Sequence, residues 1–218
     1  MNSSIACSWS GGKDSCYALM LALKEDVSLK VIVNMMNENG KISRSHGLPL
    51  SILQQQANAI GVPLVAISTS WNGYEKNFVE TLDHIKENYK VSSVVFGDID
   101  LQEHRSWEES VCKKVGLNAW LPVWKKNRKT MVRELIDAGV ESVIVSCNTV
   151  LGEEFLGRKI DTELIPELEA KGVDVCGENG EFHTVVINCP LFKERIQLPE
   201  FRKVRNEDYW FCVFDRES

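Results

Sequence analysis

The chain has 218 residues, of which 44% are hydrophobic and 26% are charged, and its formal net charge is −6. This acidic balance disfavours free nucleic acid as a partner, because binding a phosphate backbone needs a basic surface. No apolar stretch approaches the ~20 residues that cross a bilayer, and the first residues lack the basic flank of a signal peptide. We therefore expect a cytoplasmic protein without a membrane partner.

The cysteines are scattered through the chain and odd in number. They are Cys7, Cys16, Cys112, Cys147, Cys176, Cys189 and Cys212. No pair has the Cys-x-x-Cys spacing that is typical of zinc sites and dithiol redox motifs. Most of them adjoin apolar residues, so we expect small buried side chains in a reducing compartment.

In the first half of the chain, short apolar runs alternate with segments of helical periodicity. Strands are expected at residues 5–9, 29–36, 63–68, 93–96 and 118–121, and helices at residues 16–23, 49–60, 75–88 and 106–115. Gly61 is placed to end the second of these helices. This alternation is typical of an α/β fold with a parallel sheet and crossover helices.

After residue 125 the pattern loosens. The basic stretch 125–129 is interpreted as a solvated loop, followed by a helix at residues 130–138 with Thr130 as its N-cap. Further along, a strand is expected at residues 141–147, a helix at 160–171, and antiparallel strands at 184–188 and 210–214. We predict two domains, residues 1–125 and a smaller α+β domain at residues 126–218.

A glycine-rich turn joins the first expected strand to the first helix. It consists of Ser10, Gly11, Gly12, Lys13, Asp14 and Ser15. The two glycines let the backbone approach an anion closely, and the following helix presents free N–H groups and the positive end of its dipole. The spacing matches neither the Walker A loop nor the dinucleotide fingerprint Gly-x-Gly-x-x-Gly. A connection without a ligand is the structural alternative, but the position favours phosphate binding.

The same six residues resemble the Ser-Gly-Gly-x-Asp-Ser motif of the N-type ATP pyrophosphatases, also called PP-loop enzymes. The resemblance implies a Rossmann-like parallel sheet for the first domain. It also implies that the turn binds the pyrophosphate end of ATP, with Mg²⁺ bridging the phosphates. The adenine would then lie against the end of the second strand, around Asn34, Met35 and Met36.

Three further strings are similar to one branch of that superfamily, the diphthine–ammonia ligase family. They lie at residues 97–99, 151–159 and 177–184. Members of this family adenylate a carboxylate on a modified histidine of elongation factor two, and ammonium then displaces AMP to form an amide. The resemblance implies ATP, ammonium and a carboxylate acceptor as the binding partners. It further implies that the second domain helps to build the acceptor pocket.

The chemistry suggests roles for individual residues. Lys13 would hold the phosphates, Asp14 would help to place the metal, and Glu178 and Glu181 would attract ammonium and accept a proton. Gly97 and Asp98 follow a parallel strand and would face the ligand crevice. Candidate acceptor-binding residues are Glu153, Gly157, Arg158, Gly177, Asn179, Gly180, His183 and Thr184.

Some of these residues also have a purely structural interpretation. Asp98 could cap the following turn, and the stretch 153–159 could be a solvated loop. His46 follows the second strand and could reach the nucleotide or the acceptor, or lie in a surface loop.

The string at residues 178–184 departs from the pattern of the family. It has Asn179 where Gly is usual and His183 where a carboxylate is usual. An imidazole changes the charge of the acceptor pocket and its titration near neutral pH. The departure does not affect the expected ATP chemistry, but it leaves the identity of the acceptor open. The variant string is similar to that of bacterial relatives, and a corrinoid is one alternative acceptor for them.

Two other functions compete with an amide-forming ligase. A tRNA thiolase of the same superfamily would use Cys147 and Cys176 as a sulfur pair, although the acidic charge disfavours it. A nucleotide sensor would bind ATP without turnover. A homodimer is the default expectation for the oligomeric state.

Overall fold

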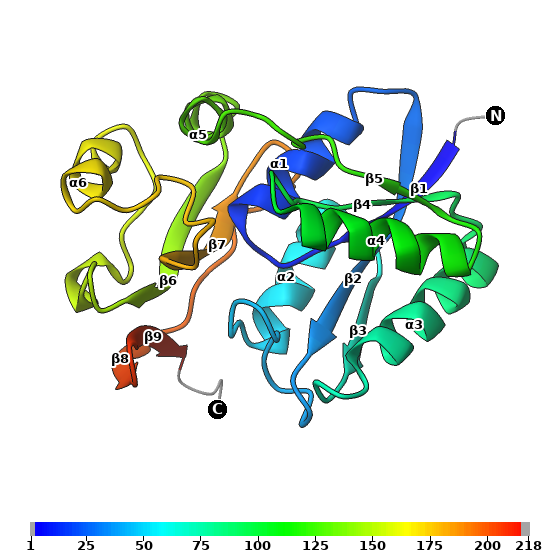
Figure 1. The fold of residues 1–218 in the computed structure, drawn as a ribbon, viewed down its shortest axis with the longest axis horizontal. Coiled ribbons are helices and arrows are strands. Elements are labelled where there is room, and N and C mark those ends of the chain that lie inside the picture. Colours follow the sequence, from blue (N-terminus) through cyan, green and yellow to red (C-terminus); the bar gives the residue numbers. More distant parts are fainter. Residues whose placement is uncertain (1–2, 215–218) are drawn as a thin grey trace.

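The structure is a computed structural model that describes residues 3–214, and its first part is a parallel α/β sheet (Figure 1). The strands are β1 (Ser3–Ser8), β2 (Val27–Met36), β3 (Leu64–Ser68), β4 (Ser93–Val95) and β5 (Asn118–Trp120). The helices between them are α1 (Lys13–Ala22), α2 (Leu50–Ile60), α3 (Tyr74–Tyr89) and α4 (Gln102–Lys114). All strand pairs are parallel, in the order β3-β2-β1-β4-β5, which confirms the predicted Rossmann-like sheet.

The alternation of side chains along β1 divides the core between the two faces of this sheet. Ala6 packs with Phe78 of α3 and Val111 of α4, whereas Ile5 and Cys7 belong to the core on the opposite face, with α1 and α2. Each face of the sheet is thus covered by helices, as is usual for parallel sheets.

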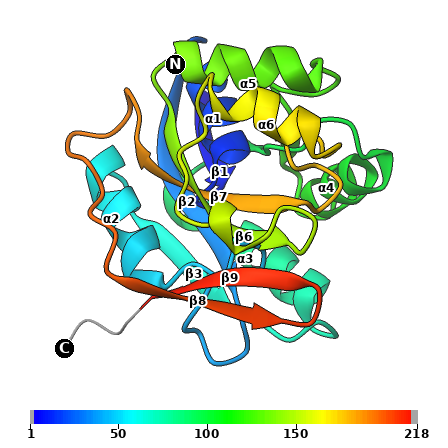
Figure 2. The same cartoon turned by 90° about the vertical axis from the view of Figure 1, so that its left-hand side faces the viewer.

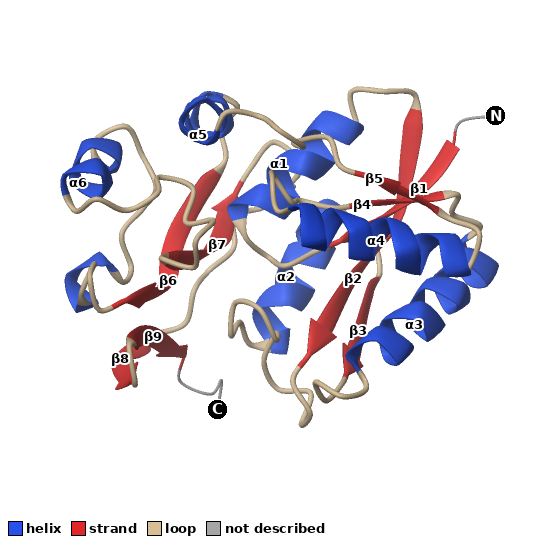
Figure 3. Cartoon of the chain, in the orientation of Figure 1, coloured by secondary structure: helices blue, strands red, loops and turns tan. Residues whose placement is uncertain are grey.

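The second part contains an antiparallel sheet (Figure 3). Its strands are β6 (Glu141–Asn148), β7 (Phe182–Asn188), β8 (Phe201–Asn206) and β9 (Tyr209–Phe214), in the order β7-β6-β9-β8. Its helices are α5 (Arg128–Asp137), α6 (Leu164–Ala170) and the 3₁₀-helix η1 (Glu153–Phe155). Figure 2 looks onto this part, with α5 and α6 at the top, β6 and β7 in the middle and the β8–β9 hairpin at the bottom. The predicted α+β character is confirmed, although β8 was not predicted.

In the second part, the starts of both α-helices differ from those expected. Helix α5 begins at Arg128, and its N-cap is Asn127, whose Oδ1 accepts a hydrogen bond of 3.0 Å from the N–H of Thr130, so the expected Thr130 cap was wrong. The helix expected from residue 160 begins at Leu164, because the N–H of Ile160 donates to the carbonyl of Ser142 instead.

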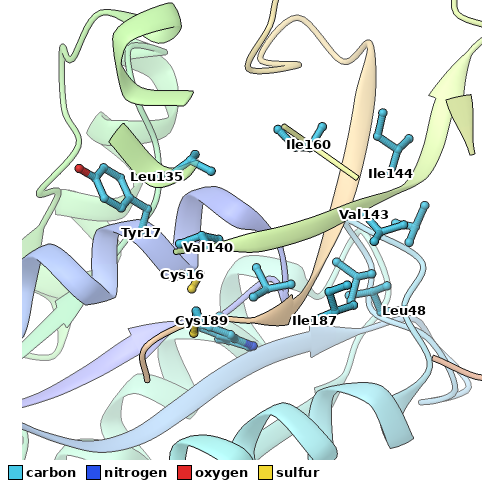
Figure 4. Close-up of a cluster of buried hydrophobic side chains, with 14 of the residues drawn as sticks. Cys16, Tyr17, Leu48, Leu135, Val140, Val143, Ile144, Ile160, Ile187 and Cys189 are labelled. Atoms are coloured by element: carbon cyan, nitrogen blue, oxygen red, sulfur yellow. The ribbon is translucent and has the colours of Figure 1, made fainter. Parts of the chain in front are cut away.

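One apolar core joins the two parts of the molecule. Cys16, Tyr17 and Leu48 of the first part lie in the same cluster as Leu135, Val140 and Ile187 of the second (Figure 4). The seven cysteines are free and buried, as expected. No helix within residues 3–214 is long and apolar enough to cross a membrane.

Candidate active site

The glycine turn connects β1 to α1 in a conformation that excludes larger residues. Gly11 has φ +86°, which L side chains rarely adopt. A Cβ atom on Gly11 would lie 2.6 Å from Cδ1 of Leu48, and one on Gly12 would lie 2.3 Å from Cε1 of His46. Both glycines are therefore required by the packing as well as by any ligand.

Strand β7 of the second part holds the turn in place. The N–H of Val186 donates to the carbonyl of Gly11 at 2.8 Å, and Oγ1 of Thr184 accepts from the N–H of Lys13 at 3.1 Å. Nε2 of Gln56 also donates to the carbonyl of Gly11, at 3.0 Å. Thr184, expected to bind the acceptor, thus supports the first turn of α1.

Lys13 is the central cation of the site. Its side chain is 3% exposed, and Nζ lies 2.8 Å from Oδ2 of Asp14 and 2.5 Å from the carbonyl of Cys176. Burial opposes the charged form, but the negative charges of Asp14 and Glu178 outweigh it and raise the pKa of Lys13. The ammonium group therefore stays charged beside the turn.

A cavity of about 650 Å³ opens in front of the turn, at the carboxyl ends of β1 and β4 and against the second part. Ligands of parallel α/β sheets bind at this edge. The predicted site residues that line it are Ser10, Lys13, Asp14, Ser15, Gly97, Asp98, Gly177, Glu178, Gly180, His183 and Thr184. The structure thus brings strings from three distant regions of the sequence to one cavity.

Other predicted residues do not line this cavity. Nδ2 of Asn34 donates to the carbonyl of Trp9 at 2.7 Å, and the side chains of Met35 and Met36 are buried in the two cores. The role of these three residues beside an adenine stays a prediction. Arg158 forms a bidentate pair with Glu167, at 2.6 Å for both bonds. Glu153 and Gly157 are exposed, as the solvated-loop interpretation expects.

Glu181 and Asn179 build the loop that carries Glu178. The carboxylate of Glu181 accepts from the N–H of Asp174, the N–H of Asn179 and Nδ2 of Asn179, each at 3.0 Å. Burial opposes the charged form of Glu181, but these bonds lower its pKa. The carboxylate therefore orders the loop, and its expected part in ammonium capture stays a prediction.

The cavity contains a row of carboxyl groups that starts at the turn. Burial first, and then the charge of Asp14, raises the pKa of Glu178 to about 8, and Asp98 adds to this shift. Oδ1 of Asp98 lies 2.6 Å from Nδ1 of His104. Oδ1 of Asp14 is buried and has no hydrogen-bond partner among the described residues.

Two histidines close the side of the cavity next to the turn. The rings of His46 and His183 lie 4.8 Å apart, and Nδ1 of His46 is 2.7 Å from the carbonyl of Thr184. Burial lowers the pKa of His46 to about 4 and that of His183 to about 3. Both imidazoles are neutral at neutral pH, so His183 does not bring positive charge to the site.

The cavity also has an aromatic wall that was not predicted from the sequence. It is formed by Trp71, Tyr74, Phe78, Phe96 and Trp107. Trp71 is 73% exposed, and the guanidinium of Arg44 lies 4.5 Å from its ring centroid. Along the sequence Tyr74, Phe78 and Trp107 read as ordinary apolar positions of two helices, and only the packing of α3 beside α4 brings them together.

The thiolase alternative requires two cysteines at the reaction site. Cys176 lines the cavity, with its Sγ 3.1 Å from the carbonyl of Arg128. Cys147 does not line it, and its Sγ is 3.2 Å from the carbonyl of Gly152. Burial raises the pKa of Cys147 to about 11, which disfavours the thiolate.

A parallel sheet with a glycine turn, a helix N-terminus and a buried lysine defines an α/β protein of the phosphate-binding class. Residues 3–119 match the family model of the diphthamide synthase N-terminal domain, and residues 127–218 match that of the C-terminal domain. The chain belongs to the diphthamide synthase family.

Its curated relatives include proteins named diphthine–ammonia ligase. The Rattus norvegicus and Homo sapiens proteins are 29% and 28% identical to this chain, and each match covers 88% of this chain and 81% of the relative. The Schizosaccharomyces pombe protein is 25% identical over 93% of this chain, which spans 37% of that longer relative.

Proposed function

We propose that this chain is an ATP-dependent ligase that adenylates a carboxylate and forms an amide with ammonium, releasing AMP and pyrophosphate. The relatives named diphthine–ammonia ligase support diphthine as the acceptor. The family match over both parts of the chain supports the same chemistry.

The observation that carries the proposal is the placement of Lys13. Lys13 is a buried cation in the first turn of α1, and it lines the cavity together with Ser10, Asp14 and Ser15. Attack of a carboxylate on the α-phosphorus expels pyrophosphate, and its developing charge needs fixed positive groups. Lys13 supplies such a charge at the N-terminus of α1.

Mg²⁺ fits the same end of the cavity. Oδ1 of Asp14 is an unpartnered buried carboxylate oxygen, which is a hard ligand of the kind that Mg²⁺ prefers. No group of three or more His, Cys, Asp and Glu residues in the described chain could hold a metal by itself. This agrees with Mg²⁺ sites that use one or two carboxylates together with substrate phosphates and water. The ion would supply charge neutralisation of the phosphates.

The second domain would bind the acceptor. Its loop from Gly177 to His183 forms one side of the cavity, facing the turn and the end of β4. An acceptor carboxylate on this side could reach the α-phosphorus of an ATP whose phosphates lie at Lys13. Glu178 also lines the cavity, and its pKa, raised to about 8, suits it to hold a proton there.

The test is exchange of labelled pyrophosphate into ATP in the absence of ammonium, with diphthine-bearing elongation factor two as the acceptor. Adenylation is reversible before ammonium arrives, so exchange should require the acceptor. Formation of ADP and phosphate, or exchange that ignores the acceptor, would contradict the proposal. A sensor module would bind ATP and show no exchange at all.

A further inference from the structure

Glu108 is a buried acidic residue that the chemistry above does not use. It lies on α4, is 4% exposed and lines the cavity, and its Oε2 has no hydrogen-bond partner among the described residues. A buried acceptor without a donor is unfavourable. The position therefore calls for a donor that arrives with a ligand.

The surroundings of Glu108 favour a small cation. Aromatic rings of Tyr74, Phe78 and Trp107 stand together in the cavity wall, with Phe78 and Trp107 at 5.1 Å and Tyr74 and Trp107 at 5.7 Å between centroids. Ring faces attract cations. Asp98 is the second carboxyl group that lines the cavity here. Burial first, and then a side-chain hydrogen bond with Asp98, raises the pKa of Glu108 to about 10.

Asp98 also connects this pocket to the reaction site. It raises the pKa of both Glu108 and Glu178, and the charges of Asp14 and Lys13 also act on Glu178. Oδ1 of Asp98 is 2.6 Å from Nδ1 of His104, whose side chain is 59% exposed. Asp98 thus has a buried neighbour, a neighbour near the phosphates and a neighbour in contact with solvent.

We propose that Asp98 and Glu108, walled by Tyr74, Phe78, Phe96 and Trp107, bind the ammonium ion that the ligase consumes. The proposal rests on the proposed function above. It moves the ammonium site from Glu178 and Glu181 to the pocket on α4. Ammonium has four N–H donors, which suit the two carboxyl groups, and its positive charge suits the rings.

The proton balance follows from the same contacts. An N–H bond of ammonium breaks and its proton moves to the carboxylate of Asp98, which leaves the nitrogen with a free electron pair. That pair forms the C–N bond at the acyl-adenylate carbonyl, and the C–O bond to AMP breaks with its electrons on AMP. The nitrogen then loses a second proton. Each proton then passes to water from Asp98, whose side chain is 28% exposed and whose Oδ1 contacts Nδ1 of His104.

The test separates ammonium from ATP. Glu108→Met removes the acceptor and keeps the length of the side chain, and Glu109→Gln, at the neighbouring exposed position, is the matched control. Glu108→Met is expected to raise the KM for ammonium roughly tenfold or more. The KM for ATP and the acceptor-dependent pyrophosphate exchange should stay at the wild-type values, as should all parameters of the control. A raised KM for ATP would make the aromatic wall an adenine pocket and overturn the proposal, as would unchanged kinetics.

A second measurement does not depend on turnover. Crystals of the wild type soaked in thallous salt, whose ion is close to ammonium in size, should show an anomalous peak between Asp98 and Glu108 that Glu108→Met abolishes. If the wild type shows no acceptor-dependent pyrophosphate exchange, the proposed function is wrong, whatever the result at the cation site. The anomalous peak then tests separately whether Asp98 and Glu108 bind a cation. Absence of the peak in the soaked wild type would overturn the inference.

Discussion

Lys13 is the residue on which the proposed binding of the phosphates depends. Lys13→Met removes the positive charge that acts on both Asp14 and Glu178. We expect the rate of pyrophosphate exchange to fall by about 100-fold, as for other losses of a fixed charge-stabilising group. Lys24→Met, in the exposed turn that follows α1, is the control and should exchange normally. A fully active Lys13→Met protein with a wild-type melting curve would remove Lys13 from the chemistry.

The histidine pair makes a pH prediction with a defined sign. The folded pKa of His183, about 3, lies below its unfolded value of about 6.5. Between these values the unfolded state binds a proton that the folded state lacks, so this group destabilises the fold as the pH falls. Its contribution is fully present above about pH 6.5. His183→Gln should therefore lose less unfolding free energy than the wild type between about pH 7 and pH 5. Urea titrations of both proteins at the two pH values measure this difference. An equal loss of unfolding free energy in the wild type and His183→Gln would contradict the lowered pKa of His183.

At the scale of elements, two variants at the start of α5 test whether Asn127 is the N-cap of this helix. Asn127→Ala removes the side chain that accepts from the N–H of Thr130 and should lower the free energy of unfolding by about 1 kcal/mol. Thr130→Ala should cost less, because its hydroxyl only donates to Oδ1 of Asn127. Chemical denaturation of the two variants gives the order, and the reverse order would restore Thr130 as the cap.

Local elements of the fold were predictable from the sequence, whereas contacts between distant elements were not. The glycine turn was predictable because a strand, two glycines and a helix follow one another within a few residues. The hydrogen bond from the N–H of Lys13 to Thr184 was not, because its partners are 171 residues apart. Strand β8 carries Arg202, Lys203 and Arg205 on a largely exposed edge, so no apolar alternation marks it.

For the whole molecule, the shared core makes a prediction about cooperativity. Residues of α1 and α2 pack in one cluster with α5, β6 and β7, and Val186 bonds directly to the glycine turn. We expect the two parts to unfold in a single transition, with tryptophan fluorescence and far-ultraviolet circular dichroism giving the same urea midpoint. Two separated midpoints would show that each part folds alone.

The site as a whole was only half predictable. The motifs around Lys13, Asp98 and Glu178 predicted the side of the cavity that we propose for the phosphates and the acceptor, because residues of these types suit that chemistry. Trp107 and Glu108 gave no such signal, since one aromatic and one acidic residue on a helix are typical of an ordinary amphipathic pattern. Their proposed role depends on the tertiary packing, which buries Glu108 and brings the rings of Phe78 and Trp107 together.

The central claim is that an acceptor carboxylate attacks the α-phosphorus of ATP. It is tested most directly by labelling the acceptor carboxylate with heavy oxygen and analysing the products by mass spectrometry after a reaction with ATP, Mg²⁺ and ammonium. We predict one heavy oxygen in AMP, none in pyrophosphate, and an amide in the acceptor that keeps the other. Label in phosphate, or AMP that carries none while the amide forms, would contradict the account.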